Sequence, residues 1–176
     1  VKQYENAKEK GCVIAYDCRR GSIEFSKAAA QVLATNGMKV YLFTALRPTP
    51  ELSFAVRHLK CAGGIMITAS HNPPQYNGYK VYDDEGCQLI PHLADSVTNE
   101  VNNVTDMFNI EVRPYDELVK EGKILEIDSL VDIPYLEAVK TIPVNEVKKD
   151  NIKIVYTPLH GTGCAFMVDL LEGEGY

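Results

Sequence analysis

The stretch of this chain with the most chemistry is Thr-Ala-Ser-His-Asn-Pro-Pro, residues 68–74, which directly follows an apolar run. Two consecutive prolines restrict the backbone after Asn72, so we expect a rigid turn. A second tight turn, Asn-Gly, then returns the chain with Lys80 on the next strand. Ser70, His71 and Lys80 are therefore predicted to converge. Together they suit phosphoryl transfer, because the lysine offsets anionic charge while the hydroxyl carries the phosphoryl group.

Simpler interpretations of the same residues stay open. Ser70 and Asn72 can cap a turn. His71 can be a surface imidazole, and Lys80 can be a solvated strand lysine. A serine hydrolase is less favoured, because the frame Gly-x-Ser-x-Gly is absent around Ser70. Neither a Walker A nor a G-x-G-x-x-G pattern occurs, so no nucleotide-binding loop is predicted.

The elements that must position this loop begin with a strand, a helix and a second strand. A continuous apolar run at residues 12–16 predicts a buried strand that ends at Asp17. Ser22 is the predicted N-cap of a helix that Gly37 ends. The apolar face of this helix is predicted to carry Phe25, Ala29, Val32, Leu33 and Asn36. Residues 39–44 predict a second strand, parallel to the first.

The pattern continues with a second helix and a third strand. Thr49 is the predicted N-cap, Pro50 the first helical residue, and the glycines at 63–64 the helix stop. The buried face is predicted to carry Leu52, Ala55, Val56 and Leu59. Residues 65–69 then predict the strand that leads into the serine loop. Because ligand sites in α/β sheets lie beyond the carboxyl ends of strands, this is where a nucleophile is expected.

The remaining sequence predicts a hairpin, further helices and a second unit like the first. These elements are hairpin strands at 79–82 and 87–90, a strand at 152–156, and helices at 1–10, 93–104, 115–121, 128–141 and 164–172. The helix at 128–141 contains Pro134, and the region 106–127 is otherwise a connection. The predicted fold class is α/β, with a mixed, mostly parallel sheet flanked by helices, plus the first βα unit of a second similar domain.

Composition limits the classes of function. Of 176 residues, 45% are hydrophobic and 24% charged, which is typical of a soluble globular protein. The net charge of −6 argues against a broad nucleic-acid surface. Apolar runs are too short to cross a bilayer and no secretory leader opens the chain, so we expect no membrane partner and a cytoplasmic location. The five cysteines lack C-x-x-C spacing and the four histidines lack H-x-x-x-H spacing, which predicts reduced thiols and no zinc site.

Residues 68–80, TASHNPPQYNGYK, resemble the phosphoserine loop of the α-D-phosphohexomutase family, which includes phosphoglucomutases and phosphomannomutases. Supporting motifs are Tyr-Asp-x-Arg at 16–19, Pro-Thr-Pro at 48–50, Gly-x-Gln-Leu-Ile at 86–90 and Tyr-Thr-Pro-Leu-His-Gly-Thr-Gly at 156–163. The resemblance covers essentially the whole chain. It implies the domain I fold of that family and an isomerase, an intramolecular phosphotransferase that interconverts hexose 1-phosphate and hexose 6-phosphate through a bisphosphate.

The resemblance also implies roles for individual residues. Ser70 matches the serine that is phosphorylated, gives its phosphoryl group to a sugar monophosphate and takes one back from the bisphosphate. His71 and Lys80 match catalytic positions beside it, and Lys80 is expected to move the proton of the sugar hydroxyl. Arg19 and Asn72 are expected to bind substrate or phosphate.

The family implies Mg²⁺, bound by the phosphoserine and by three aspartates of a D-G-D-x-D-R loop, and a hexose bisphosphate activator such as glucose 1,6-bisphosphate. That loop is absent here, so Ser70 is the expected metal ligand of this chain, through its phosphate. We therefore expect an internal fragment, inactive alone and completed by the missing domains of its parent. Residues 1–127 are the predicted domain I, truncated at its N-terminus, and 128–176 a linker helix and the start of domain II. His160 is expected to have an interdomain structural role.

Two alternatives for the function stay open. One is a non-enzymatic module, on the same fold, that binds phosphosugars or regulates their use. The other is a phosphopentomutase. In every case the expected partner is a small phosphosugar, and the sequence does not indicate which sugar phosphate is preferred.

Overall fold

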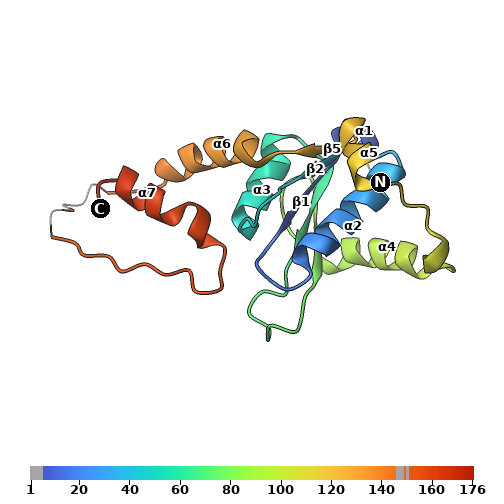
Figure 1. Cartoon of the computed structure of the whole chain (residues 1–176), viewed down its shortest axis with the longest axis horizontal. Coiled ribbons are helices and arrows are strands. Elements are labelled where there is room, and N and C mark those ends of the chain that lie inside the picture. The colour runs from blue at the N-terminus through green and yellow to red at the C-terminus, as the bar shows by residue number, and fades with distance from the viewer. Residues whose placement is uncertain (1–5, 146–148, 150) are drawn as a thin grey trace.

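The computed structural model describes residues 6–145, 149 and 151–176. A five-stranded sheet with the order β4-β3-β1-β2-β5 forms its centre (Figure 1). The strands are β1 (Cys12–Tyr16), β2 (Val40–Leu42), β3 (Gly63–Ile67), β4 (Tyr79–Tyr82) and β5 (Ile124–Glu126). Neighbouring strands are parallel except for β4, which pairs antiparallel with β3. The predicted mixed, mostly parallel sheet is confirmed.

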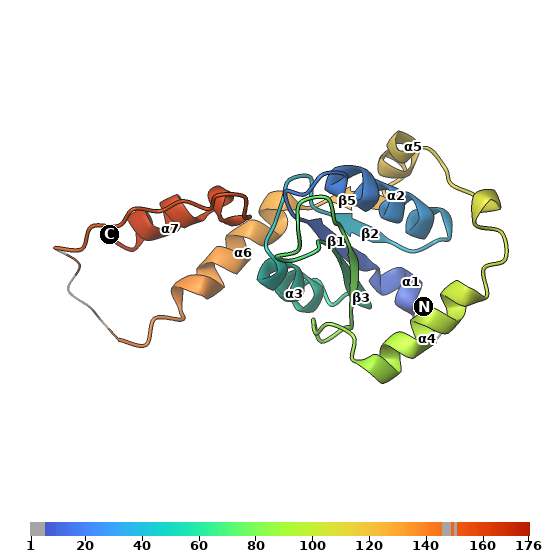
Figure 2. The ribbon, with the colours of Figure 1, turned by 90° about the horizontal axis from the view of Figure 1, so that it is seen from below.

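Helices α2 (Ser22–Thr35) and α5 (Tyr115–Lys120) contribute to the core on one face of this sheet, and α3 (Thr49–His58) and α6 (Asp128–Lys140) to the core on the other. The remaining helices are α1 (Ala7–Lys10), α4 (Pro91–Asn102) and α7 (Met167–Gly173), with 3₁₀ turns η1 (Met107–Asn109) and η2 (Gly163–Ala165). Figure 2 shows α2 and α3 on opposite sides of the sheet. Successive residues of β1 alternate between the two sides: Ile14 joins the core under α2 and α5, whereas Val13 and Ala15 join the core under α3 and α6.

The buried face of α2 agrees only in part with the predicted one: Ala29 and Leu33 pack against the core, but they are only partly buried. Its buried residues are the small ones, Ser22, Ser26, Ala30 and Ala34, spaced four apart. The predicted Phe25 is 53% exposed. The helix begins after Gly21, so Ser22 is not the N-cap; its hydroxyl donates to Asp17 instead. Small side chains let a helix lie close to a sheet, and the serine hydroxyls stay hydrogen bonded, so their burial costs little. The predicted stop at Gly37, with φ of 84°, is confirmed.

The glycines at 63–64 were predicted to end α3. They lie inside β3 instead. A Cβ at Gly63 would lie 2.6 Å from the carbonyl oxygen of Tyr82, and one at Gly64 would lie 2.7 Å from a methyl group of Val56. Both positions therefore lack room for a side chain. The helix ends instead at His58. Thr49, the predicted N-cap, is the first helical residue, so the helix begins one residue earlier than predicted.

Several strands differ from the predicted ones. The strand predicted at 39–44 covers only Val40–Leu42, and the strand predicted at 65–69 runs from Gly63 to Ile67. In the predicted hairpin, only β4 forms, and residues 87–90 make a single bridge from Gln88 to Tyr82. The connecting region contains β5, which pairs parallel with β2 and was not predicted. The predicted strand at 152–156 is not formed. Its Val155 is 97% exposed, and strand backbone needs a neighbouring strand to satisfy its hydrogen bonds.

The other helix predictions hold with small shifts. The helices predicted at 93–104, 115–121, 128–141 and 164–172 are observed as α4, α5, α6 and the shorter η2–α7 pair. The helix predicted at 1–10 falls partly outside the described residues, and α1 is its described part. No helix in the described part of the chain combines the length and apolar character needed to cross a membrane.

Candidate active site

The serine loop lies at the carboxyl end of the sheet. β1 and β3 are parallel neighbours, so the loop after β1 and the loop after β3 emerge side by side, as Figure 1 shows at the lower end of the sheet. The first loop carries Asp17 and Arg19, and the second carries Ser70 and His71. The predicted position of the serine loop beyond the end of β3 is confirmed.

Ser70 is exposed and has a strained backbone. Its φ is 55°, in the left-handed region, which costs an L residue about 1–2 kcal/mol. Its N–H donates to Oγ1 of Thr68 at 3.0 Å. Its Oγ lies 3.2 Å from Nδ1 of His71, within hydrogen-bond range. The surrounding loop therefore holds this hydroxyl outward, beside an imidazole that can give or take a proton.

Asp17 connects the two loops. Its Oδ2 accepts a hydrogen bond of 2.6 Å from the hydroxyl of Thr68. Its Oδ1 accepts from the N–H of Arg19 at 3.0 Å and from the hydroxyl of Ser22 at 3.1 Å. Because Thr68 in turn accepts from Ser70, the backbone of the serine is fixed through one threonine to the aspartate after β1.

Arg19 holds the serine loop through its main chain. The guanidinium donates to four carbonyl oxygens of that loop, those of Ser70 at 2.6 Å, Asn72 at 2.7 Å, Tyr76 at 2.8 Å and Pro73 at 3.0 Å. Its Nε lies 3.4 Å from Oδ2 of Asp17. Each guanidinium nitrogen thus already faces an acceptor of the chain. This arrangement gives Arg19 a positioning role, and its predicted contact with a phosphate stays a prediction.

The Asn-Gly turn closes the base of the loop. The N–H of Thr68 donates to the carbonyl oxygen of Gly78 at 3.1 Å, and a Cβ at Gly78 would lie 2.7 Å from the carbonyl oxygen of Thr68. The amide of Asn77 donates to the carbonyl oxygen of Arg20 and to the hydroxyl of Ser22. Glycine is needed here because the two strands of the loop approach so closely, and the asparagine amide ties the turn to the loop after β1.

A cleft of about 290 Å³ opens beside Ser70. Its lining residues are Asp17, Thr49, Met66, Thr68, Ser70, His71, His160, Gly161 and Thr162. The structure therefore brings Ser70 and His71 together with a turn nearly ninety residues later in the chain. Sequence reasoning named neither Thr68 nor Thr162 as a site residue. The motifs Tyr-Asp-x-Arg and Thr-Pro-Leu-His-Gly-Thr-Gly were the available signals.

Three predicted site residues do not line this cleft: Arg19, whose contacts are given above, Lys80 and Asn72. Lys80 is paired with Met66 across β4 and β3, which places both on the same face of the sheet, and Met66 does line the cleft. Asn72 is exposed, and its main chain accepts from Arg19 and donates to Ala69. The catalytic role of Lys80 and the binding role of Asn72 stay predictions.

The residues present do not make a magnesium site by themselves. In residues 6–145, 149 and 151–176, no three His, Cys, Asp or Glu side chains lie together in a way that could hold a metal ion. The carboxylate of the cleft belongs to Asp17, and both of its oxygens accept hydrogen bonds from the chain. Since Mg²⁺ prefers several oxygen ligands in octahedral geometry, the described side chains do not complete its coordination shell.

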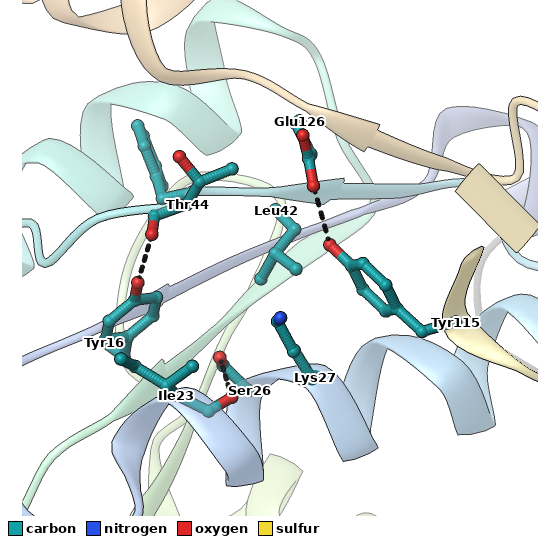
Figure 3. Close-up of a pocket in the computed structure, with 9 residues that line it drawn as sticks. Tyr16, Ile23, Ser26, Lys27, Leu42, Thr44, Tyr115 and Glu126 are labelled. Atoms are coloured by element: carbon teal, nitrogen blue, oxygen red, sulfur yellow. Dashed lines mark hydrogen bonds between the residues drawn. The ribbon is translucent and has the colours of Figure 1, made fainter. Parts of the chain in front are cut away.

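A second, smaller pocket of about 100 Å³ lies over α2 at the ends of β2 and β5 (Figure 3). Its polar groups already have partners. The hydroxyl of Tyr16 donates to the carbonyl oxygen of Thr44, and that of Tyr115 donates to Glu126 at 3.0 Å. Burial raises the pKa of both tyrosines above the ordinary value. Lys27 lies over the ring of Tyr115, with its Nζ 4.9 Å from the centroid. The cleft beside Ser70 is therefore the better candidate site.

Comparison with known proteins identifies a family for the part of the chain that contains the serine loop. Residues 1–107 match the family model described as phosphoglucomutase/phosphomannomutase, alpha/beta/alpha domain I. A phosphoglucomutase of Staphylococcus saprophyticus is 39% identical over 171 residues, which is 97% of this chain and 31% of that protein. A phosphoglucomutase of Staphylococcus aureus is 37% identical over 178 residues, which is 32% of its length. The chain thus spans about a third of the curated relatives it matches.

Solved structures give the same fold. A crystal structure from Thermus thermophilus, assigned as a phosphomannomutase, superposes with a TM-score of 0.56 and 36% identity, covering 74% of this chain and 26% of that one. A phosphoglucomutase/phosphomannomutase family protein from Burkholderia thailandensis superposes with a TM-score of 0.54 and 21% identity, covering 77% and 30% of the two chains. The second likeness concerns the fold alone.

Proposed function

Because the chain belongs to the phosphoglucomutase/phosphomannomutase family, we propose that it supplies the phosphoserine of a phosphosugar mutase. The reaction interconverts hexose 1-phosphate and hexose 6-phosphate through a hexose bisphosphate. The observation that carries the proposal is Ser70 itself. Its hydroxyl is exposed at a cleft of about 290 Å³, on a left-handed residue that Arg19 and Thr68 hold in place.

The chemistry follows from that position. A hydroxyl of the sugar phosphate attacks the phosphorus of phosphorylated Ser70; a new P–O bond forms to the sugar and the P–Oγ bond breaks. The proton of the sugar hydroxyl passes to a base, for which the family motif favours Lys80. The Oγ of Ser70 regains a proton, and His71, with Nδ1 at 3.2 Å, is placed to provide it. Transfer of the other phosphoryl group of the bisphosphate back to Ser70 completes the cycle.

The proposal extends to cofactor and location. The family motif favours Mg²⁺ on the phosphoryl group of Ser70, where the ion stabilises negative charge, and a hexose bisphosphate as activator. The remaining metal ligands are not assigned to residues of this chain. Arg19 contributes by keeping the loop in position. All five cysteines are unpaired thiols, which supports a reducing compartment such as the cytoplasm.

Phosphoryl uptake tests the proposal directly. The full-length parent, which supplies the domains that this chain is expected to lack, is exposed to glucose 1,6-bisphosphate and its intact mass is measured, with peptide mapping of the modified residue. One phosphoryl group is expected on Ser70. The Ser70→Ala variant is expected to take up none, whereas Ser129→Ala, which changes an exposed serine of α6, is expected to match the parent.

Two outcomes would contradict the proposal. One is uptake by Ser70→Ala at the parental level, which would place the phosphoryl group elsewhere. The other is tight binding of the bisphosphate by the parent with no transfer at all, which would favour the non-enzymatic binding module.

A further inference from the structure

The serine loop is joined to the loop after β1 at three places. At its start, the hydroxyl of Thr68 donates to Oδ2 of Asp17 at 2.6 Å. At its end, the amide of Asn77 donates to the hydroxyl of Ser22 at 2.9 Å, and that hydroxyl donates to Oδ1 of Asp17 at 3.1 Å. Between them, the loop carbonyls accept from the guanidinium of Arg19, whose Nε lies 3.4 Å from Oδ2 of Asp17. All three connections therefore meet at one carboxylate.

The described groups that face this carboxylate are hydrogen-bond donors. The hydroxyl of Thr68 accepts from the N–H of Ser70, which leaves its own proton for Asp17. The hydroxyl of Ser22 likewise accepts from the end of the serine loop and donates to Asp17. The main-chain N–H of Arg19 is a further donor, at 3.0 Å. A carboxylate accepts from each of them, whereas an amide of the same shape would place an NH₂ group against a donor.

Ser70 needs support from its surroundings, because its φ of 55° is unfavourable for an L residue. Both polar groups of its main chain are occupied: the N–H donates to Thr68 at 3.0 Å, and the carbonyl oxygen accepts from Arg19 at 2.6 Å. Both partners also contact Oδ2 of Asp17. Thr68 is buried and the side chain of Asp17 is 13% exposed, so water does not readily replace these bonds. A strained conformation persists only where its surroundings fix it, and here one aspartate joins the groups that do so.

We propose that Asp17 is a positioning residue of the phosphoryl-transfer site, which acts through Thr68 and Arg19 to keep the main chain of Ser70 left-handed and its hydroxyl at the cleft. Both oxygens of the carboxylate accept hydrogen bonds from the chain, so it acts on the serine through these neighbours. The inference rests on the proposed function, because it explains how the phosphoserine of that reaction is held in place.

Two measurements on the full-length parent test this role. Mass spectrometry over time follows the uptake of a phosphoryl group by Ser70 from glucose 1,6-bisphosphate, and amide hydrogen exchange follows the opening of residues 68–78. Asp17→Asn keeps the shape of the side chain and removes one acceptor. It is expected to slow uptake about a hundredfold and to speed exchange in the loop about tenfold. Thr68→Val removes the hydroxyl and is expected to slow uptake about tenfold, with faster exchange as well.

The conservative variant Thr68→Ser separates hydrogen bonding from packing. It retains the hydroxyl and is expected to match the parent in both measurements. A packing role would give the reverse order, because serine loses the methyl group that valine retains. Matched controls come from α4: Asp95→Asn and Thr98→Val change exposed residues of the same types and are expected to behave like the parent.

The outcomes distinguish this inference from the proposed function. Parental exchange in both Asp17→Asn and Thr68→Val would overturn the positioning role, whatever their rates of uptake. Faster exchange with parental uptake would show that the reaction does not need this hold on Ser70, and would overturn the inference too. Faster exchange in both variants, with no uptake by the unmodified parent, would retain the hold of Asp17 on the loop and reject the mutase.

Discussion

Two arginines follow neighbouring strands of this sheet and do different work. Arg19 follows β1 and Arg47 follows β2, and their side chains are 11% and 7% exposed. Arg19 donates mainly to neutral carbonyl groups of a surface loop, the class of segment that most often carries function. Arg47 faces carboxylates of helices α3 and α6. The same guanidinium group thus positions a site in one place and stabilises the fold in another.

The surroundings of Arg47 are crowded with negative charge. Its Nε and one terminal nitrogen donate to the two oxygens of Asp132, both at 2.8 Å. A terminal nitrogen also lies 3.4 Å from Asp128, and Nε lies 3.9 Å from Glu51. The ring of Phe43 lies 5.6 Å away. One buried cation therefore faces three acidic side chains at the contact between α3 and α6.

The largest expected effect comes from removing that cation. Arg47→Met keeps the length of the side chain and leaves the partly exposed carboxylates of Asp128 and Asp132 without this partner. Breaking a fully buried pair costs about 3–5 kcal/mol, so a loss of about 2–3 kcal/mol is expected here. Urea unfolding measures the free energy. Arg57→Met, an exposed arginine on α3, is the control and is expected to change it by less than about 0.5 kcal/mol. A loss below about 1 kcal/mol for Arg47→Met would show that the carboxylates at this contact are not held by charge.

The second effect concerns Arg19 and the rate at which Ser70 takes up a phosphoryl group. Arg19→Lys retains the charge, but an ammonium group cannot face four carbonyls at once. Phosphoryl uptake by Ser70 is expected to slow about a hundredfold, since small errors in position weaken catalysis strongly, while unfolding changes by about 1 kcal/mol or less. Mass spectrometry over time and urea unfolding give the two readouts.

Arg20→Lys is the matched control for this variant, because Arg20 is the exposed neighbour and joins the loop through its carbonyl group. It is expected to react like the parent. If Arg19→Lys reacted at the parental rate, the carbonyl contacts would be incidental to the position of the serine. If it lost stability as strongly as Arg47→Met, the two arginines would have the same role.

Much of the fold was predictable because its signals are local. The apolar run of β1 and the alternating residues of β4 predicted both strands at their observed bounds. The face of α2 was not predictable from the positions of its large residues, because close packing on the sheet selects small ones. The three residues of β5 are too few for a periodic signal, and their strand exists through pairing with β2. The unformed strand at 152–156 has the right pattern and lacks a neighbour in the described chain.

In the candidate site, too, some residues could be predicted from the sequence and others could not. Ser70 and His71 stand in one motif, so their neighbourhood followed from the sequence. The four carbonyls around Arg19 depend on the path of a loop more than fifty residues later, which no pattern encodes. The turn at 160–162 reaches the cleft only through tertiary docking. Lys80 was expected on the strand that follows the Asn-Gly turn, and it lies there, on β4, opposite Met66 of β3. Its convergence with Ser70 stays a prediction.

The smallest expected effect concerns the charge state of Glu51, which lies beside Arg47, and it refines the comparison of the two arginines. Glu51 is fully buried, and neither of its carboxylate oxygens accepts a hydrogen bond from a described residue. Burial, together with the nearby carboxylate of Asp132, raises the pKa of Glu51 to about 8, against the opposing effect of Arg47. The other groups that face it are Asp128 and Tyr135 of α6. Glu51 is therefore protonated at neutral pH in the folded protein.

The consequence for stability has a definite sign. In the unfolded chain the carboxyl loses its proton near pH 4.3, whereas in the folded chain it keeps the proton until about pH 8. Between these values the folded state binds more protons, so raising the pH lowers the stability, and the loss levels off above the folded pKa. Glu51→Gln cannot ionise and is therefore expected to be more stable than the parent at alkaline pH, with little difference near pH 4.

Urea unfolding of both proteins from pH 4 to pH 9 measures this difference, with Glu137→Gln, an exposed residue of α6, as the control that follows the parent. Parallel stability curves for the parent and Glu51→Gln would mean that Glu51 is ionised beside Arg47 across this range. In that case all three acids would share the cation, and the contrast with the neutral partners of Arg19 would be complete. A curve for Glu51→Gln that diverges upward with pH instead means that Arg47 balances two charges and a neutral acid.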